Sequence, residues 1–139
     1  MTIKVGINGM GRIGRMIVRS IYENYKGKII IKHINNRSNS EICANLLKHD
    51  SIHGNFSSLV KSGGNYIKIN KEKISYTQHS IIDDIKWKKY GVDYVFECTG
   101  NFNSKDQLMP HIENGVKKVI VSAPCKMADK TIVFGINHN

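Results

Sequence analysis

Residues 3–14 read Ile-Lys-Val-Gly-Ile-Asn-Gly-Met-Gly-Arg-Ile-Gly and set the fold class of the chain. The apolar residues Ile3, Val5 and Ile7 alternate with other residues, which predicts a short strand. The strand runs into a Gly-x-Gly-x-x-Gly turn. From Arg12 to about Tyr25, apolar residues recur at three- and four-residue spacing, which predicts a helix. A glycine-rich turn between a strand and a helix is typical of folds that bind dinucleotides.

The three glycines of this turn have separate expected roles. Gly9 is expected to make the tight turn, Gly11 to let the backbone approach a pyrophosphate, and Gly14 to permit close packing of the helix on the strand. The pyrophosphate would lie against free amide groups at the helix N-terminus, where the helix dipole favours negative charge. The motif in this context therefore predicts dinucleotide binding.

The rest of the chain alternates strand patterns with helix patterns. Further strands are predicted at residues 28–34, 92–98, 118–122 and 132–134, and a β-hairpin at residues 66–69 and 74–77. Helices are predicted at residues 12–25, from the Ser-Asn-Ser segment 38–40 to just before Asp50, and from a cap at Ser104 to Gly115. The buried stripe expected on the first helix contains Ile13, Met16, Ile17, Ser20 and Ile21. Together these patterns predict an α/β fold, a Rossmann-type, doubly wound, mainly parallel sheet with a β-hairpin insertion.

Length and composition favour one domain without a membrane segment or a metal site. A chain of 139 residues is close to the commonest domain size. It contains no run of about 20 apolar residues, which a membrane-spanning helix requires, and no secretory signal pattern. Its three cysteines, Cys43, Cys98 and Cys125, are widely spaced and odd in number, so we expect free thiols in a soluble, cytoplasmic protein.

The formal charge of +10 favours anionic partners. The lysines are spread along the whole chain, without the dense basic run or interleaved aromatic residues that single-strand nucleic-acid binders show. The abundance of Lys, Ile and Asn is better explained by an A/T-rich coding bias. We therefore expect no nucleic-acid partner, although a dinucleotide would benefit from the positive field.

The end of the second predicted strand bears on the choice of cofactor. An acidic residue about 20 positions beyond the third glycine commonly receives the ribose hydroxyls of NAD, but residues 33–38 here read His-Ile-Asn-Asn-Arg-Ser. Asn36 removes the repulsion that a carboxylate would exert on a 2′-phosphate, and Arg37 and Ser38 could donate hydrogen bonds to one. The alternative is an ordinary polar loop. We expect the cofactor to be NAD or NADP, with NADP accepted at least as well.

Four blocks along the chain carry a family resemblance. Residues 4–15 closely resemble the opening of glyceraldehyde-3-phosphate dehydrogenases, and further blocks follow in the family's order at residues 46–54, 97–102 and 117–124 with 134–138. The resemblance covers essentially the whole chain. It implies the cofactor domain of a phosphorylating, NAD(P)-dependent aldehyde oxidoreductase of glycolysis or gluconeogenesis.

The resemblance also implies which residues hold the cofactor. Asn8, Arg12 and Ile13 would hold the adenosine and pyrophosphate portions. The other implied positions are Asn36, which reads the ribose, Thr99, Gly100 and Phe102 on the adenine-ribose side, and Ser122 and Ala123 beneath the nicotinamide end. The alternative for Thr99, Phe102 and Ser122 is ordinary packing at strand ends. Two departures are Asn36, where NAD-preferring members carry an aspartate, and residues 78–82, where many members carry a basic residue and a proline.

No catalytic residue is expected in this chain. The family's nucleophilic cysteine lies in a Ser-Asn-Ala-Ser-Cys-Thr-Thr-Asn-Cys segment beyond the Gly-Ile-Asn-His tract, so residues 1–139 are expected to form the dinucleotide-binding domain alone, inactive when isolated, with the catalytic domain absent. His49, His53 and the pair Asp83-Asp84 are interpreted as structural. The full-length family enzyme is expected to be a homotetramer. The alternatives are an autonomous dinucleotide-binding or sensing module and the cofactor domain of an erythrose-4-phosphate dehydrogenase.

Overall fold

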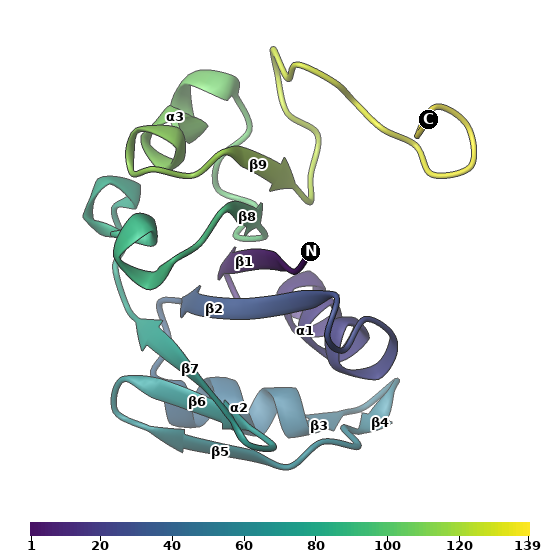
Figure 1. Ribbon diagram of the computed structural model, residues 1–139, viewed down its shortest axis with the longest axis vertical. Helices are drawn as coiled ribbons and strands as arrows, with labels where there is room; N and C mark the ends of the chain where they lie inside the picture. Colours follow the sequence, from purple (N-terminus) through teal and green to yellow (C-terminus); the bar gives the residue numbers. More distant parts are fainter.

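A computed structural model describes residues 1–139. Seven strands form the main sheet, in the order β5-β6-β7-β2-β1-β8-β9 (Figure 1). Their bounds are β1 Ile3–Asn8, β2 Ile29–Asn35, β5 Val60–Gly63, β6 Tyr66–Ile69, β7 Glu72–Thr77, β8 Tyr94–Glu97 and β9 Lys118–Val121. The remaining elements are α1 Arg12–Asn24, α2 Ser40–Lys48, α3 Lys105–Glu113, the 3-10 segments η1 Ile82–Asp84 and η2 Trp87–Tyr90, and the short pair β3 His49–Asp50 and β4 Gly54–Asn55.

The sheet is parallel through its centre and antiparallel at one edge. Strand β1 lies between β2 and β8 and is parallel to both, and β7 and β9 continue the parallel arrangement outward. Strand β6 is antiparallel to both of its neighbours, β5 and β7. The predicted Rossmann-type fold is thus confirmed, and the predicted hairpin is extended by β5 into a three-stranded insertion.

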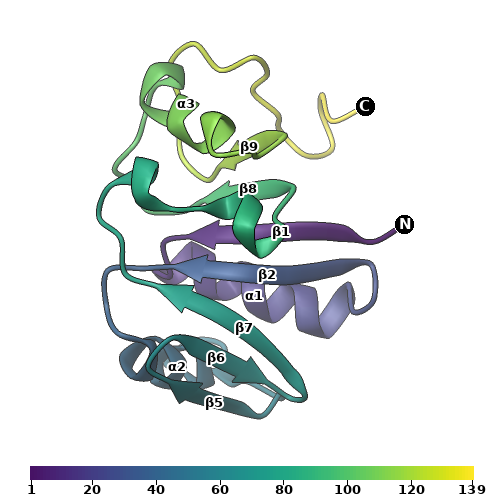
Figure 2. The same cartoon turned by 60° about the vertical axis from the view of Figure 1, so that its left-hand side comes forward.

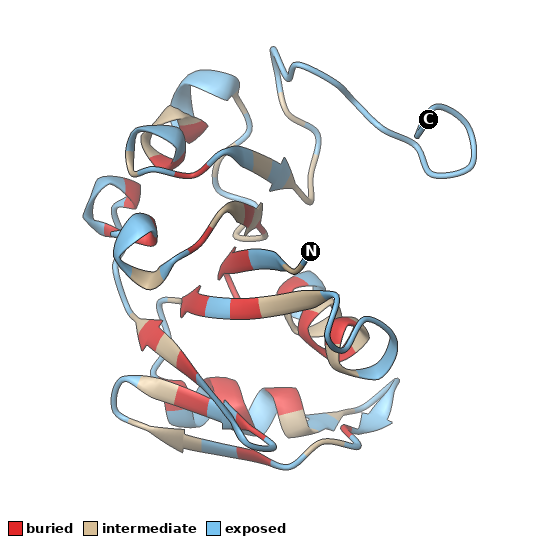
Figure 3. Ribbon diagram, in the orientation of Figure 1, coloured by how far each residue is buried: buried red, intermediate tan, exposed pale blue.

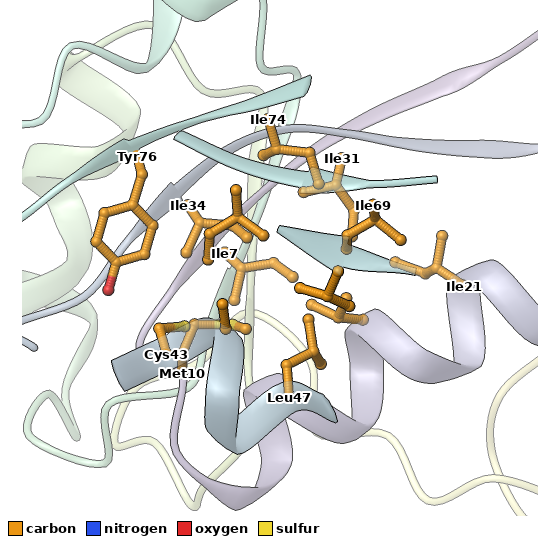
Figure 4. Close-up of a cluster of buried hydrophobic side chains, with 14 of the residues drawn as sticks. Ile7, Met10, Ile21, Ile31, Ile34, Cys43, Leu47, Ile69, Ile74 and Tyr76 are labelled. Carbon is orange, nitrogen blue, oxygen red and sulfur yellow. The ribbon is translucent and has the colours of Figure 1, made fainter. Parts of the chain in front are cut away.

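Both faces of the sheet are buried, as a parallel sheet requires. On one face, apolar side chains of α1 and α2 pack on β1, β2 and the insertion, in a cluster that includes Ile7, Ile34 and Leu47 (Figures 2 and 4). On the opposite face, a smaller cluster forms around the fully buried Trp87. Buried residues follow the strands through the middle of the molecule (Figure 3).

The buried face of α1 differs from the predicted stripe. Ile21 is buried as expected, but Ile13 is 48% exposed, and Val18 and Arg19 are buried instead. The helix is turned so that the Arg19 guanidinium donates hydrogen bonds to the carbonyls of Leu47, Lys48 and Gly54. A buried arginine satisfied by backbone carbonyls is invisible to a pattern built on apolar residues.

The strand predicted at residues 132–134 is wrong. Ile132, Val133 and Phe134 are 58%, 50% and 88% exposed, and none of them pairs with a strand. The sheet ends at β9, and the chain beyond it leaves the sheet and turns, with the Val133 carbonyl accepting from Ile136 N at 3.0 Å (Figure 1). An apolar, β-branched run becomes a strand only where a neighbour supplies its ladder hydrogen bonds.

The other boundaries agree with the prediction within a few residues. Asn39 caps α2, its side chain accepting from Ile42 N at 2.9 Å. Ser104 is at the N-cap of α3 as predicted, but its side chain makes no capping bond. No helix is both long enough and apolar enough to cross a membrane.

A substitution at Gly6 tests how closely Trp87 packs against β1. A methyl group built on Gly6 would come within 2.5 Å of the Trp87 ring, so Gly6→Ala is expected to destabilise the fold by about 1–3 kcal/mol through overpacking. Urea unfolding measures this loss. Gly64→Ala is the matched control because a methyl group there meets nothing within 4 Å. Equal stability of the two variants would contradict the packing described here.

Candidate functional site

One pocket lies where the parallel strands end. The carboxyl ends of β1, β2, β7 and β8 point to the same edge of the sheet (Figure 2). The chain leaves β1 toward β2 on one side and reaches β8 on the other, so this edge is a topological switch point, where ligands bind in open α/β sheets. The predicted residues that line the pocket are Asn8, Gly9, Gly11, Asn36, Arg37, Thr99 and Phe102.

The three glycines of the turn meet different constraints. Gly9 has φ +94°, and a side chain there would also come within 2.7 Å of Thr99 N. A methyl group on Gly14 would lie 2.1 Å from the Gly9 carbonyl oxygen, so this glycine allows the helix to approach the turn. At Gly11 a methyl group would meet nothing within 4 Å. The protein itself requires Gly9 and Gly14, whereas Gly11 leaves open the space from which a ligand would approach the start of α1.

A row of hydrogen-bonded side chains crosses the strand ends. Thr77, Asn35, Asn8 and Glu97 are the last residues of β7, β2, β1 and β8, which are neighbours in the sheet. Thr77 Oγ1 donates to Asn35 Oδ1 (2.8 Å), Asn35 Nδ2 donates to Asn8 Oδ1 (2.9 Å), and Asn8 Nδ2 donates to Glu97 Oε2 (2.7 Å). Every bond in the row points its hydrogen toward Glu97.

Glu97 is a buried carboxylate held by four donors. It is 1% exposed, and besides Asn8 it accepts from His111 Nε2 (2.8 Å), Thr99 N (3.0 Å) and Thr99 Oγ1 (2.6 Å). Burial raises the pKa of Glu97, but the hydrogen bonds from His111, Thr99 and Asn8 outweigh burial, so its pKa lies below the ordinary value. Glu97 is therefore ionised at neutral pH.

His111 is a neutral donor to this carboxylate. Trp87 Nε1 lies 2.8 Å from His111 Nδ1, and an indole nitrogen can only donate. His111 Nδ1 must therefore accept, which leaves the single ring proton on Nε2, facing Glu97. The negative charge of Glu97 is balanced by hydrogen bonds alone, without a cation.

His33 lies behind the other end of the row and is also neutral. Burial, and secondarily His79, lower its pKa to about 3. Its ring stacks on Tyr90 at 3.8 Å between centroids, and Nε2 lies 2.8 Å from Thr77 Oγ1. His33 Nδ1 also lies 2.7 Å from Ser75 Oγ, so the hydrogen-bonded row continues through the His33 ring toward the smaller cluster around Trp87.

Six predicted site residues do not line the pocket. Arg12 at the start of α1 forms a 3.0 Å salt bridge to Asp50. Backbone hydrogen bonds from His53 and Ile52 are the main reason that the pKa of Asp50 is held low. The others are Ile13, which faces outward, Gly14, which packs on the turn, Gly100, whose φ is +72°, and Ser122 and Ala123, which follow β9.

The pocket also contains residues that sequence reasoning missed. Asn35 and Cys98 are adjacent to predicted positions at strand ends, so the strand boundaries could have suggested them. Asn101 follows the predicted Thr99 and Gly100. The segment after β7 contributes His79, Ser80 and Ile82, which belong to the tract 78–82 that the resemblance marked as a departure, and Ile85, which was not predicted. No group of three or more His, Cys, Asp or Glu side chains is placed to hold a metal ion.

A strand, glycine turn and helix at the switch point of a parallel sheet define a dinucleotide-binding domain of the Rossmann class. Residues 3–105 match the family described as "Glyceraldehyde 3-phosphate dehydrogenase, NAD binding domain". The chain belongs to this family, as its sequence blocks predicted.

Curated relatives match along the whole chain. Glyceraldehyde-3-phosphate dehydrogenase of Cereibacter sphaeroides is 44% identical over 138 residues, which are 99% of this chain and 41% of the relative. Glyceraldehyde-3-phosphate dehydrogenase 2 of Bacillus subtilis (strain 168) is 40% identical over 100% of this chain and 40% of its own length. The enzyme of Pseudomonas aeruginosa is 37% identical over 99% and 42%. The chain thus spans about two fifths of the length of these relatives.

Glu97→Gln tests the role of the buried carboxylate. A glutamine oxygen can still accept from Asn8 and His111, but the amide nitrogen then faces the Thr99 N–H, so two donors oppose each other. We expect the variant to lose about 1–3 kcal/mol of unfolding free energy. Urea unfolding measures the loss, with the exposed Glu113→Gln as control. If Glu97→Gln leaves the free energy of unfolding unchanged, the ionised carboxylate does not hold the strand ends together.

Proposed function

We propose that residues 1–139 form the cofactor domain of a phosphorylating glyceraldehyde-3-phosphate dehydrogenase and bind NAD or NADP at the carboxyl edge of the sheet. The observation that carries the proposal is the open approach over Gly11 to the start of α1, beside a pocket lined by Asn8 and Thr99. The helix dipole and the unpaired amides of a first helical turn favour a pyrophosphate there. When bound, the cofactor accepts the hydride, while this chain's residues bind and orient it.

The chemical step belongs, in this proposal, to residues outside this chain. Burial raises the pKa of the Cys43 and Cys98 thiols to about 11 each, so both stay protonated at neutral pH and are poor nucleophiles. Cys125 is not among the residues that line the pocket at the strand ends. We therefore propose that the isolated chain is inactive, and that the catalytic domain and the homotetramer belong to the full-length enzyme.

The geometry around Asn36 supports acceptance of NADP. Asn36 Oδ1 accepts from Met10 N at 3.1 Å, so this uncharged side chain is held beside the glycine turn. Arg37 lines the same pocket and forms no salt bridge within the protein. An uncharged donor beside a free guanidinium suits a 2′-phosphate better than a carboxylate would.

Calorimetric titration with NAD, NADH, NADP and NADPH at fixed salt tests the proposal. NADPH should bind at least as tightly as NADH, and Arg37→Ala should weaken NADPH by about tenfold or more, the value of a hydrogen bond to a charged group, with little effect on NADH. Asn36→Asp should favour NADH by repelling the 2′-phosphate. Lys61→Ala in β5, outside the pocket, is the control for lost positive charge. A wild-type preference for NADH of more than about tenfold would contradict the assignment of the 2′-phosphate site.

A further inference from the structure

The loop of residues 36–38 follows β2. It is held by hydrogen bonds to the last two residues of β7 and to the residue after them. Asn36 N donates to the Thr77 carbonyl at 3.0 Å. Gln78 Nε2 donates to the Arg37 carbonyl at 3.0 Å, and the Tyr76 hydroxyl donates to the Ser38 carbonyl at 2.5 Å. Three successive residues of the loop are thus bonded to three successive residues of the neighbouring strand and its end.

Two of these three bonds come from side chains that reach the loop from opposite environments. Tyr76 is 3% exposed, and its ring lies in the apolar cluster beside Cys43 (Figure 4). Its hydroxyl is the only polar atom of the side chain, and the Ser38 carbonyl satisfies it. Gln78 is exposed, and its side chain makes one hydrogen bond, to the Arg37 carbonyl. The loop is therefore fixed from the core by Tyr76 and from the surface by Gln78.

We propose that Gln78 and Tyr76 are positioning residues that determine cofactor selectivity, because they fix the backbone of Arg37 and Ser38 before the ligand arrives. The inference rests on the proposed 2′-phosphate site. A guanidinium on an unrestrained loop loses conformational freedom when it binds a phosphate, and this ordering weakens affinity. With the Arg37 carbonyl and the Ser38 carbonyl both held, that ordering is already present in the free protein. The loop that contains Asn36 and the tract at residues 78–82, the two departures from the family pattern, are thus joined by the bond between Gln78 and Arg37.

The test is a double-mutant cycle with NADPH and NADH. Gln78→Ala and Tyr76→Phe should each weaken NADPH by about two- to tenfold, the cost of one mobile side chain, while NADH binding stays unchanged. In an Arg37→Ala background, both effects should disappear, because no guanidinium remains to be positioned. Tyr66→Phe, whose hydroxyl makes no hydrogen bond, is the matched control. Thermal unfolding verifies that each variant is folded. If Tyr76→Phe does not fold, the comparison uses Gln78→Ala alone, because Gln78 is exposed and its loss does not disturb the core.

The outcomes separate the two proposals. If Arg37→Ala leaves NADPH binding intact, the 2′-phosphate site itself is overturned, and the positioning role falls with it. If Arg37→Ala weakens NADPH but Gln78→Ala has no effect, or weakens both cofactors equally, only the positioning role is overturned. A loss confined to NADPH that vanishes in the Arg37→Ala background supports it.

Discussion

The buried carboxylate of Glu97 constrains the arrangement of the strand ends. A charge taken out of water is tolerated only when hydrogen bonds or a counter-ion satisfy it, and here four donors do so without a cation. Those donors come from β1, from the turn after β8 and from α3. The hydrogen bonds to the Glu97 carboxylate therefore fix these elements relative to one another and keep Asn8 and Thr99 at the edge of the pocket.

The same network joins the two cores of the domain. His111 donates a hydrogen bond to Glu97 and accepts one from Trp87. The Trp87 ring packs against the backbone of Gly6 on the far face of β1. On the near face, Arg19 joins α1 to the end of α2 through backbone carbonyls. Hydrogen bonds between polar groups that are distant in sequence thus determine how the apolar layers pack on each other. The pocket lies where these bonds hold the strand ends.

Sequence reasoning predicted the features with a local signature. The glycine turn specified the first strand, the first helix and the ligand edge, and apolar, β-branched runs located most of the remaining strands. It missed the partners that only the tertiary fold creates. Asn8 and Glu97 are 89 positions apart, and Arg19 interrupts an apolar stripe in a way that no periodicity explains. The error at residues 132–134 has the same origin, because strand propensity is local but the pairing that makes a strand is not.

We propose that the strand-end row shapes a dinucleotide site at the switch point of the sheet. Amide chemical shifts recorded by nuclear magnetic resonance during titration with NADH test it most directly. We predict that the amides of Gly9, Gly11 and Thr99 move strongly and saturably, while those of Lys61 and Lys68 on the insertion stay in place. Shifts concentrated on the insertion, or none at the glycine turn at saturating NADH, would contradict a dinucleotide site at this edge of the sheet.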